Sequence, residues 1–350
     1  MVKKKIILIL FSLFFIISLS SCKKNNEIND DNTTYEIDYS IDIKYDSIDY
    51  NVPDSNNPNG YKIIYNLNNG HKIESTTTKD NKILKPFNDP IKIASTFVGW
   101  YEDKDLNNVF DFNKEIKKET TIYAKYETDY ALLTNYVSTK TIFSSVMIKS
   151  KFTDSPLSSS YFESAGSGVI ISENDNYFYC LTNNHVIYRP ENYKYSEYFV
   201  YDCYNNVYEG QIIKKDKNYD LALICFSKYD NNGKKNDELN AISFSKYMPN
   251  INDKIITLSN PKKIMNVICY GEYLDLKNFK TDNENKEKSN IQFKVIAHSA
   301  EIEDGSSGSM LLDTNLNLIG INFATQVNSK DEFQYSYAIP FDKILEFLNK

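Results

Sequence analysis

Short apolar runs separated by turn-forming residues fill the chain from about residue 140 to residue 340, and no long helical pattern interrupts them. Many short strands at close spacing are typical of an all-β barrel or sandwich. A helical pattern appears only at the end, where apolar residues in 341–348 recur at helical spacing and can pack against a barrel. The sequence therefore predicts an all-β domain with a C-terminal helix. The runs are 167–171, 178–182, 210–213, 221–224, 254–258, 266–271, 291–296, 310–312 and 318–323.

Three short motifs within this region contain the residues of a serine nucleophile and its base. They are Thr-Asn-Asn-His-Val at 182–186, Tyr-Asp-Leu-Ala-Leu at 219–223 and Asp-Gly-Ser-Ser-Gly-Ser-Met at 304–310. A hydroxyl is a poor nucleophile at neutral pH, so it needs a base, and the base needs an acid that orients it. We therefore expect His185 to be the general base, Asp220 the orienting carboxylate and Ser307 the nucleophile.

Each of these assignments has an alternative within the chain. Asp216 stands close to Asp220, but the Leu-Ala-Leu that follows Asp220 places that residue at the mouth of a buried strand. The chain has three histidines, and His298, nine residues before Ser307, is the local substitute for His185. An all-β domain without a catalytic role remains the alternative for the whole region.

The motifs stand in the order that trypsin-like serine proteases require, and the region from about 140 to 345 resembles the chymotrypsin-like fold. Its pattern is similar to proteases of the high-temperature-requirement type and to the glutamyl endopeptidase and exfoliative-toxin group. The Gly-Ser-Gly strand at 166–171 and Tyr-Ala-Ile-Pro at 337–340 extend the match. The resemblance implies a double β-barrel, an acyl-enzyme mechanism, no cofactor and no metal.

The same resemblance assigns the groups around the nucleophile. Backbone N–H groups of Gly305 and Ser307 would form an oxyanion hole, in which a donor contributes about 3 kcal/mol to lowering the barrier. The chain departs from the common motif at Ser309, which replaces a second Gly, and at Ser306, which replaces Asn or Asp. Neither departure removes a catalytic atom.

Substrate preference depends on weaker parts of the resemblance. Glu301, six residues before Ser307, would lie at the base of the S1 pocket, where a buried carboxylate favours Lys or Arg. Because loop lengths differ, the alternative is that Glu301 faces solvent. Gly320 and Asn322 are the other expected pocket positions, and Asn322 stands where glutamyl endopeptidases have a His, which argues against a glutamate-specific pocket.

The N-terminus predicts export. Three lysines at 3–5 precede an apolar run at 6–19 that is too short to span a bilayer comfortably, and Leu-Ser-Ser-Cys follows at 19–22. This motif resembles the lipobox of bacterial lipoproteins, which implies removal of 1–21, acylation of Cys22 and anchoring to the outer face of the cell membrane. The alternative is an ordinary signal peptide. The formal charge of −7 and the single Arg189 exclude a basic nucleic-acid surface.

A separate small module precedes the β-rich region. Gly-Trp-Tyr at 99–101 and Thr-Ile-Tyr-Ala-Lys at 121–125 resemble the internalin-type B repeat, a β-grasp-like module of bacterial surface proteins. The resemblance implies a surface spacer or a ligand-binding module. We expect Trp100 to be part of its core; a ligand platform is the alternative.

These observations divide the chain into four parts: a signal peptide at 1–21, a lipidated Cys and polar linker at 22–59, the repeat at 60–127 and the protease domain at 128–350. Alternating apolar residues at 35–45 suit a half-buried strand or a disordered linker. The residues after 345 leave no room for a PDZ domain. The predicted partners are a protein or peptide substrate, the membrane through Cys22 and a possible surface ligand of the repeat.

Four cysteines remain, and three of them, Cys180, Cys225 and Cys269, lie in apolar strand-like runs, have no metal-ligand spacing and are expected to be small buried thiols. By resemblance, Cys180 near His185 could instead be part of a disulfide, as in many secreted trypsin relatives. A surface binding or adhesion lipoprotein with a protease-like scaffold is the alternative function. The cysteines are Cys180, Cys203, Cys225 and Cys269.

Overall fold

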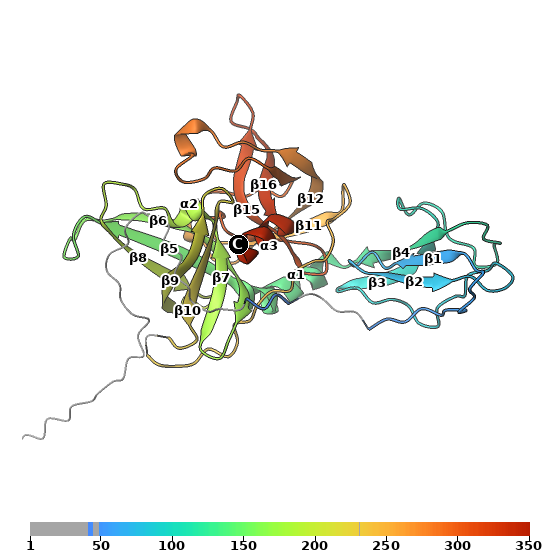
Figure 1. Cartoon of the computed structure of the whole chain (residues 1–350). Helices are drawn as coiled ribbons and strands as arrows, with labels where there is room; N and C mark the ends of the chain where they lie inside the picture. The colour runs from blue at the N-terminus through green and yellow to red at the C-terminus, as the bar shows by residue number, and fades with distance from the viewer. Residues whose placement is uncertain (1–40, 45–48, 231) are drawn as a thin grey trace, which may run out of the picture. The chain divides into compact units, whose positions relative to one another are not determined.

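The computed structural model describes residues 41–44, 49–230 and 232–350 (Figure 1). The described chain forms one four-stranded sheet and two closed six-stranded barrels. This confirms the predicted all-β class, including the double barrel and the C-terminal helix α3 (Phe341–Asn349). Cys22, the signal segment and most of the alternating stretch at 35–45 lie outside the described residues.

The repeat is a sheet in the order β2-β1-β4-β3, in which β1 and β4 run parallel. Its core contains Trp100, whose ring meets that of Tyr65 edge to face at 5.3 Å. Trp100 is therefore a core residue and is not available as a ligand platform. The strands are β1 (Lys62–Asn66), β2 (Lys72–Thr76), β3 (Ser95–Tyr101) and β4 (Thr120–Thr128).

Barrel one follows the helix α1 (Tyr130–Thr139) and the short 3-10 helix η1 (Thr141–Ser144). Its strands close in the order β10-β7-β6-β5-β8-β9. The short helix α2 (Asn184–Ile187) follows β7 directly. The strands are β5 (Ser145–Thr153), β6 (Phe162–Glu173), β7 (Tyr177–Thr182), β8 (Tyr195–Tyr201), β9 (Val207–Asp216) and β10 (Leu221–Ser227).

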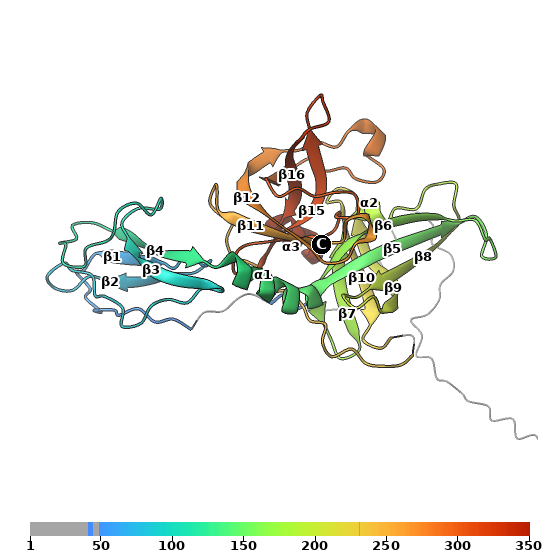
Figure 2. The ribbon, with the colours of Figure 1, turned by 180° about the vertical axis from the view of Figure 1, so that it is seen from behind.

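Barrel two closes in the order β11-β12-β13-β16-β15-β14. Two 3-10 helices interrupt its loops, η2 (Pro261–Lys263) and η3 (Asn283–Asn285). Figure 2 shows β11, β12, β15 and β16 of this barrel from behind. The strands are β11 (Lys254–Ser259), β12 (Val267–Asn278), β13 (Lys294–His298), β14 (Met310–Leu312), β15 (Leu318–Val327) and β16 (Phe333–Pro340).

Residues 221–226 of the strand β10 are all apolar instead of alternating with polar residues. Leu221 and Leu223 belong to the large core that both barrels share, whereas Ala222 and Ile224 belong to the core inside barrel one. Both faces of the strand are therefore buried. Burying each large apolar side chain contributes roughly 1.5–3 kcal/mol, so this strand fixes the position of the residue before it, Asp220.

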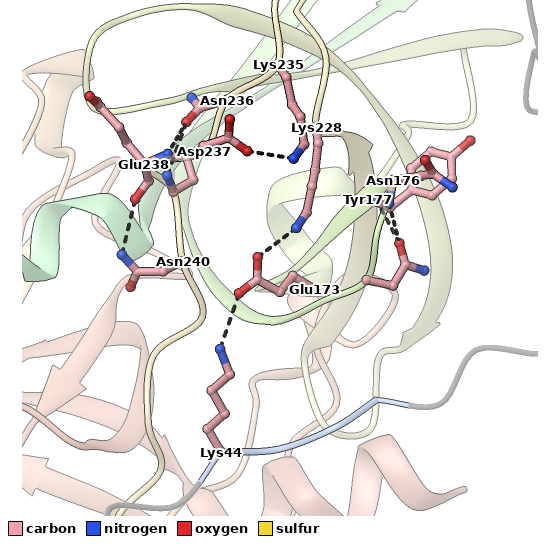
Figure 3. A network of polar contacts seen from close by, with 12 residues as sticks. Lys44, Glu173, Asn176, Tyr177, Lys228, Lys235, Asn236, Asp237, Glu238 and Asn240 are labelled. Atoms are coloured by element: carbon pink, nitrogen blue, oxygen red, sulfur yellow. Dashed lines mark hydrogen bonds and ion pairs between the residues drawn. The ribbon is translucent and has the colours of Figure 1, made fainter.

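Residues 41–44 lie against barrel one, although they form no strand. Ile41 and Ile43 pack on the shared core, and the backbone N–H of Phe244 donates to the Lys44 carbonyl at 2.7 Å. The Lys44 ammonium also pairs with Glu173 at 3.2 Å, and Lys228 pairs with the second oxygen of that carboxylate at 2.8 Å (Figure 3). This short segment is thus attached to the peptidase-like part of the chain.

Candidate active site

The pairing of β7 with β10 brings His185 and Asp220 together. Thr182 at the end of β7 faces Ala222 at the start of β10 in the antiparallel register. The residues just beyond these two strand ends therefore meet at one edge of the barrel. The Asp220 carboxylate accepts from the His185 backbone N–H at 2.9 Å and contacts His185 Nδ1 at 2.8 Å.

Asp220 is held in place by its own backbone as well. Its side chain is buried, and its φ of 51° lies in the left-handed region, which Asp tolerates better than most residues. The side-chain amide of Asn183 donates to the Asp220 carbonyl at 2.9 Å. Asp216, the alternative carboxylate, instead accepts from the Asn218 backbone N–H at 2.8 Å. The structure thus brings Asp220, and not Asp216, to the histidine.

The electrostatic surroundings of His185 favour its protonated form. Burial opposes the charge on the ring and so does the nearby Lys288, but the negative charge and hydrogen bond of Asp220 outweigh both and raise the pKa of His185 above its ordinary value. Because the Asp220 carboxylate only accepts, Nδ1 of His185 is the donor, which leaves Nε2 as the acceptor of the neutral ring. The side chain remains 28% exposed, so Nε2 can reach a substrate.

Ser307 lies in a tight turn between two glycines of positive φ, Gly305 at 92° and Gly308 at 86°. A Cβ at Gly308 would collide with the Ser167 carbonyl oxygen of barrel one. The backbone N–H of Gly308 donates to the Asn322 carbonyl at 2.8 Å. Glycine is therefore required at 308 both by conformation and by space.

Ser167 on β6 attaches barrel one to this turn. Its backbone N–H donates to the Ser307 carbonyl at 2.7 Å, and its hydroxyl donates to the Gly305 carbonyl at 2.9 Å. The same hydroxyl accepts from the Asn260 backbone N–H at 2.9 Å. Sequence reasoning placed the Gly-Ser-Gly motif only as the strand before the histidine, and it missed these contacts because 138 residues separate Ser167 from Gly305.

The peptide between Asp304 and Gly305 is oriented by a contact from η2. The Asp304 carbonyl accepts from the Lys262 backbone N–H at 2.7 Å. In a planar trans peptide the C=O and N–H groups point in opposite directions, so the Gly305 N–H points away from Lys262. Within the described residues, neither the Gly305 nor the Ser307 N–H donates to another protein group. Both are free to bind an oxygen from outside the protein.

Gly166 lies between the Ser307 carbonyl and Val186, the residue that follows His185. A Cβ at Gly166 would lie 2.9 Å from the Ser307 carbonyl oxygen and 2.6 Å from the side chain of Val186, the residue after His185. No hydrogen bond joins Ser307 to His185 in the described part of the chain; the Ser307 hydroxyl instead lies 3.5 Å from the Phe323 carbonyl. Such contacts are often long in the absence of substrate and tighten when it binds.

His298 is not beside the nucleophile. It is fully buried on β13, where its Nε2 lies 2.9 Å from Asn322 Oδ1. Burial lowers the pKa of His298 to about 4, so its ring is neutral near pH 7. The Asn322 amide nitrogen donates in turn to the Ser309 hydroxyl at 2.9 Å. His298 and Asn322 are therefore joined by hydrogen bonds to Ser309, in the turn that contains Ser307 (the nucleophile turn).

The three residues expected to line the substrate pocket have other environments. Glu301 is exposed, so it is not the buried carboxylate that would favour a basic substrate residue. The Asn322 amide is used inside the core, and a Cβ at Gly320 would meet the Ile339 carbonyl oxygen at 2.8 Å. The exposure of Glu301 agrees with the alternative that this residue faces solvent, and the substrate pocket stays a prediction.

Cys180 and Cys225 are buried, as the sequence predicted, whereas Cys269 is only half-buried, and none of the four cysteines of the described region forms a disulfide. Cys180 is fully buried, and burial raises its pKa well above the usual range. No group of three or more side chains in the described ranges could hold a metal ion. Likewise, no helix among residues 41–44, 49–230 and 232–350 is long and apolar enough to cross a membrane.

Comparison with known families gives two matches. Residues 166–321 match the model of the trypsin-like peptidase domain, and residues 61–125 match that of the Listeria-Bacteroides repeat domain. The first match contains all three motifs of the candidate site. The second covers nearly the whole small module.

Among curated proteins, a probable periplasmic serine endoprotease of the DegP-like kind from Buchnera aphidicola is 28% identical over 184 residues, which is 52% of this chain and 35% of the relative. An HtrA-like serine protease from Staphylococcus aureus is 23% identical over 194 residues, or 54% of this chain and 23% of that protein. The chain thus spans about a third or less of these relatives.

Comparison with solved structures gives matches with TM-scores below 0.5. A Mycobacterium tuberculosis protease in its active form gives a TM-score of 0.48 at 19% identity and covers 63% of this chain and 86% of its own. A serine endoprotease from Yersinia pestis gives 0.45 at 21% identity, covering 64% of this chain and 67% of its own.

Proposed function

Residues 166–321 form a trypsin-like peptidase domain, and from this premise we propose that the chain is a serine endopeptidase whose triad is His185, Asp220 and Ser307. The observation that supports this most directly is the Asp220 carboxylate, which binds both the backbone N–H and the ring Nδ1 of His185. That double contact fixes the ring and its tautomer and leaves Nε2 as a base. The proposed catalytic domain extends over 128–350, with the repeat at 60–127 before it.

The proposed reaction has two steps. In the first, His185 Nε2 takes the proton of the Ser307 hydroxyl while the oxygen attacks the peptide carbonyl carbon, and the negative oxygen binds the N–H groups of Gly305 and Ser307. His185 then gives that proton to the leaving amine as the C–N bond breaks. In the second, His185 Nε2 takes a proton from a water whose oxygen attacks the ester carbonyl carbon. The same ring then gives that proton to the Ser307 oxygen as the bond between this oxygen and the acyl carbon breaks.

Labelling with a fluorophosphonate probe tests this proposal, because the probe reacts only with an activated serine. We expect the mature protein to be labelled and Ser307→Ala to be blank. Ser329→Ala is the matched control, since Ser329 is an exposed serine in a turn of the same barrel, and it should label like the unchanged protein. Absence of labelling in the folded, unchanged protein would contradict the proposal.

We also propose that the protein is exported and anchored by lipid at Cys22. The Leu-Ser-Ser-Cys motif supports the anchor, and the Buchnera aphidicola relative is itself named a periplasmic protein. Several acyl chains on one residue would hold the protein firmly, because a single chain gives only reversible binding. Growth with a labelled fatty acid should label the protein, and Cys22→Ser should abolish that label.

A second function, ligand binding through the repeat, is favoured by its surface. Phe87 and Ile91 lie almost fully exposed on one loop between β2 and β3. Isolated exposed apolar residues are common, but two large ones on one loop suit a binding site. Under this proposal, Phe87→Ser reduces binding of the protein to intact cells and leaves fluorophosphonate labelling unchanged.

A further inference from the structure

A cluster of aromatic rings lies at the outer end of the β5–β6 hairpin. Phe152 and Phe162 face each other in the register of β5 and β6, and their rings stack at 6.1 Å with an interplanar angle of 19°. The Tyr193 ring stacks on Phe162 at 6.0 Å and 21°. We call Phe152, Phe162 and Tyr193 the aromatic platform. Figures 1 and 2 show this hairpin projecting beyond the other strands of barrel one.

The platform is open to solvent on one side. Phe152 is fully buried and supports the stack, but Phe162 is 45% exposed. Leu157 at the tip of the same hairpin is 95% exposed. A partly exposed cluster of aromatic rings is a ready binding surface for another apolar or aromatic side chain, because aromatic pairs are stabilised beyond the area they bury.

The strand β6 leads from the platform to the nucleophile. Phe162 and Gly166 are an even number of residues apart, so both side-chain positions lie on the same face of β6. At Gly166 that face touches the Ser307 carbonyl oxygen and Val186. Four residues of strand span roughly 13 Å, so the platform lies about four extended residues from the scissile bond.

Among the described residues, no strand pairs with this edge of β6 before Val169, and Lys263 of η2 forms an ion pair with Glu163. β6 pairs with β7 only from Val169 onward, whereas its pairing with β5 extends to Phe162. The Ser167 N–H points away from β5, toward the Ser307 carbonyl. By the alternation of antiparallel strands, the backbone groups of Glu163 and Ala165 point to the same open edge. An extended segment can therefore add to β6 as a further strand.

The part of the substrate that follows this path is the leaving segment. The acyl half becomes bonded to Ser307 in barrel two, where the N–H groups of Gly305 and Ser307 face its oxygen. The leaving amine must lie beside His185, because that ring gives it a proton. His185 belongs to barrel one, and residue Tyr193 of the platform comes from the loop that follows α2.

We propose that the aromatic platform binds an apolar side chain of the leaving segment, roughly four residues after the cleaved bond, and that it thereby selects substrates with a large apolar residue there. The inference rests on the proposed peptidase function. It deepens that function by assigning a substrate class to a surface remote from Ser307.

The experiment has two readouts. The full mature protein is incubated with a peptide library, and cut sites are identified by mass spectrometry; in parallel, the rate of fluorophosphonate labelling is measured. The probe has no leaving peptide, so its rate reports the triad alone. We expect cut sites of the unchanged protein to be enriched for Phe, Tyr, Leu or Ile at the third to fifth residue after the cleaved bond.

Phe162→Ser should remove this enrichment and lower kcat/KM about tenfold for a peptide with Phe at that position, with labelling unchanged. Tyr229→Ser is the matched control, because Tyr229 is an equally exposed aromatic residue of barrel one at 45%, and it should retain the enrichment. If the unchanged protein is labelled and cleaves peptides but its cut sites show no apolar enrichment at these positions, the proposed role of the platform is wrong. Absence of both labelling and cleavage overturns the peptidase function instead. Since the enrichment is read in the unchanged protein, a misfolded variant does not decide the result.

Discussion

Each barrel places one histidine at the candidate site, and the two rings have opposite properties. His185 in barrel one is partly exposed, and its partner is the carboxylate of Asp220, which raises its pKa. His298 in barrel two is fully buried, and its partner is the neutral amide of Asn322; burial lowers its pKa to about 4. The charge beside the first ring favours its protonated form, whereas the second ring is neutral near pH 7.

The comparison shows that the partner and access to solvent decide what a histidine does. A neighbouring negative charge stabilises the protonated imidazole ring, and exposure lets Nε2 reach a substrate. Without either, His298 serves as a fixed donor below the nucleophile turn. Distance along the sequence does not predict which histidine can act as a base, since His298 is much closer to Ser307 in sequence than His185 is.

The largest effect is expected from removing the charge beside His185. In Asp220→Asn the amide nitrogen would donate to Nδ1 and hold the ring in the wrong tautomer, so kcat should fall by about 10⁴. Asp216→Asn is the control, because Asp216 contacts Asn218 and Lys350 instead of His185. Cleavage of a peptide found in the library measures both variants. Equal losses in the two variants would contradict the assignment of Asp220.

The part of the site that sequence could predict is the part with short motifs. The frames around His185, Asp220 and Ser307, the double barrel and the burial of Trp100 were predicted from local patterns and resemblance. The contacts of Ser167 with Gly305 and of Asn260 with Ser167 span 138 and 93 residues, and only the closed barrels bring them together. For Glu301 the sequence left two alternatives, because its exposure depends on the course of the loop, which a motif does not contain.

The nucleophile turn should tolerate no side chain at Gly308. In Gly308→Ala the Cβ would collide with the Ser167 carbonyl in addition to the strain of a φ of 86°, so the free energy of unfolding should fall by about 3 kcal/mol or more. Gly233→Ala is the matched control: its φ is 76° but nothing lies within 4 Å, so it should cost only about 1 kcal/mol. Urea unfolding compares the two. Similar midpoints would show that barrel one does not constrain the turn.

The two histidines should act on stability in opposite pH ranges. The pKa of His298 is lowered to about 4 in the folded protein, so between pH 6.5 and 4 only the unfolded chain takes up this proton. The free energy of unfolding therefore decreases as the pH is lowered from 6.5 to 4, and this group accounts for up to about 3 kcal/mol of the decrease. The raised pKa of His185 has the opposite effect on stability. Its stabilising contribution is present below pH 6.5 and is lost as the pH rises through the pKa of the folded protein.

Urea unfolding between pH 4 and 7 tests the contribution of His298. His298→Gln retains a donor for Asn322 but does not titrate, so its stability should fall less steeply as the solution is acidified. Identical slopes for the unchanged protein and the variant would mean that His298 titrates normally, and the contrast with His185 would be lost.

The smallest effect is expected from Lys288, whose charge lowers the pKa of His185. Lys288→Gln removes that charge, while the backbone carbonyl of residue 288 can still accept from Asn184. The acid limb of kcat/KM reports the base of the free enzyme. It should therefore move to higher pH by a few tenths of a unit, because one exposed charge acts weakly through solvent.

Salt and a neighbouring variant distinguish this effect from a change in structure. Added salt screens exposed charges beyond about 8 Å at physiological ionic strength, so the displacement between the two acid limbs should shrink as salt increases. Lys286→Gln in the same loop is the control, since Lys286 is not among the groups that act on His185. A displacement to lower pH, or an equal one for both lysines, would show that the pKa of the base is set by something other than the balance between Asp220 and Lys288.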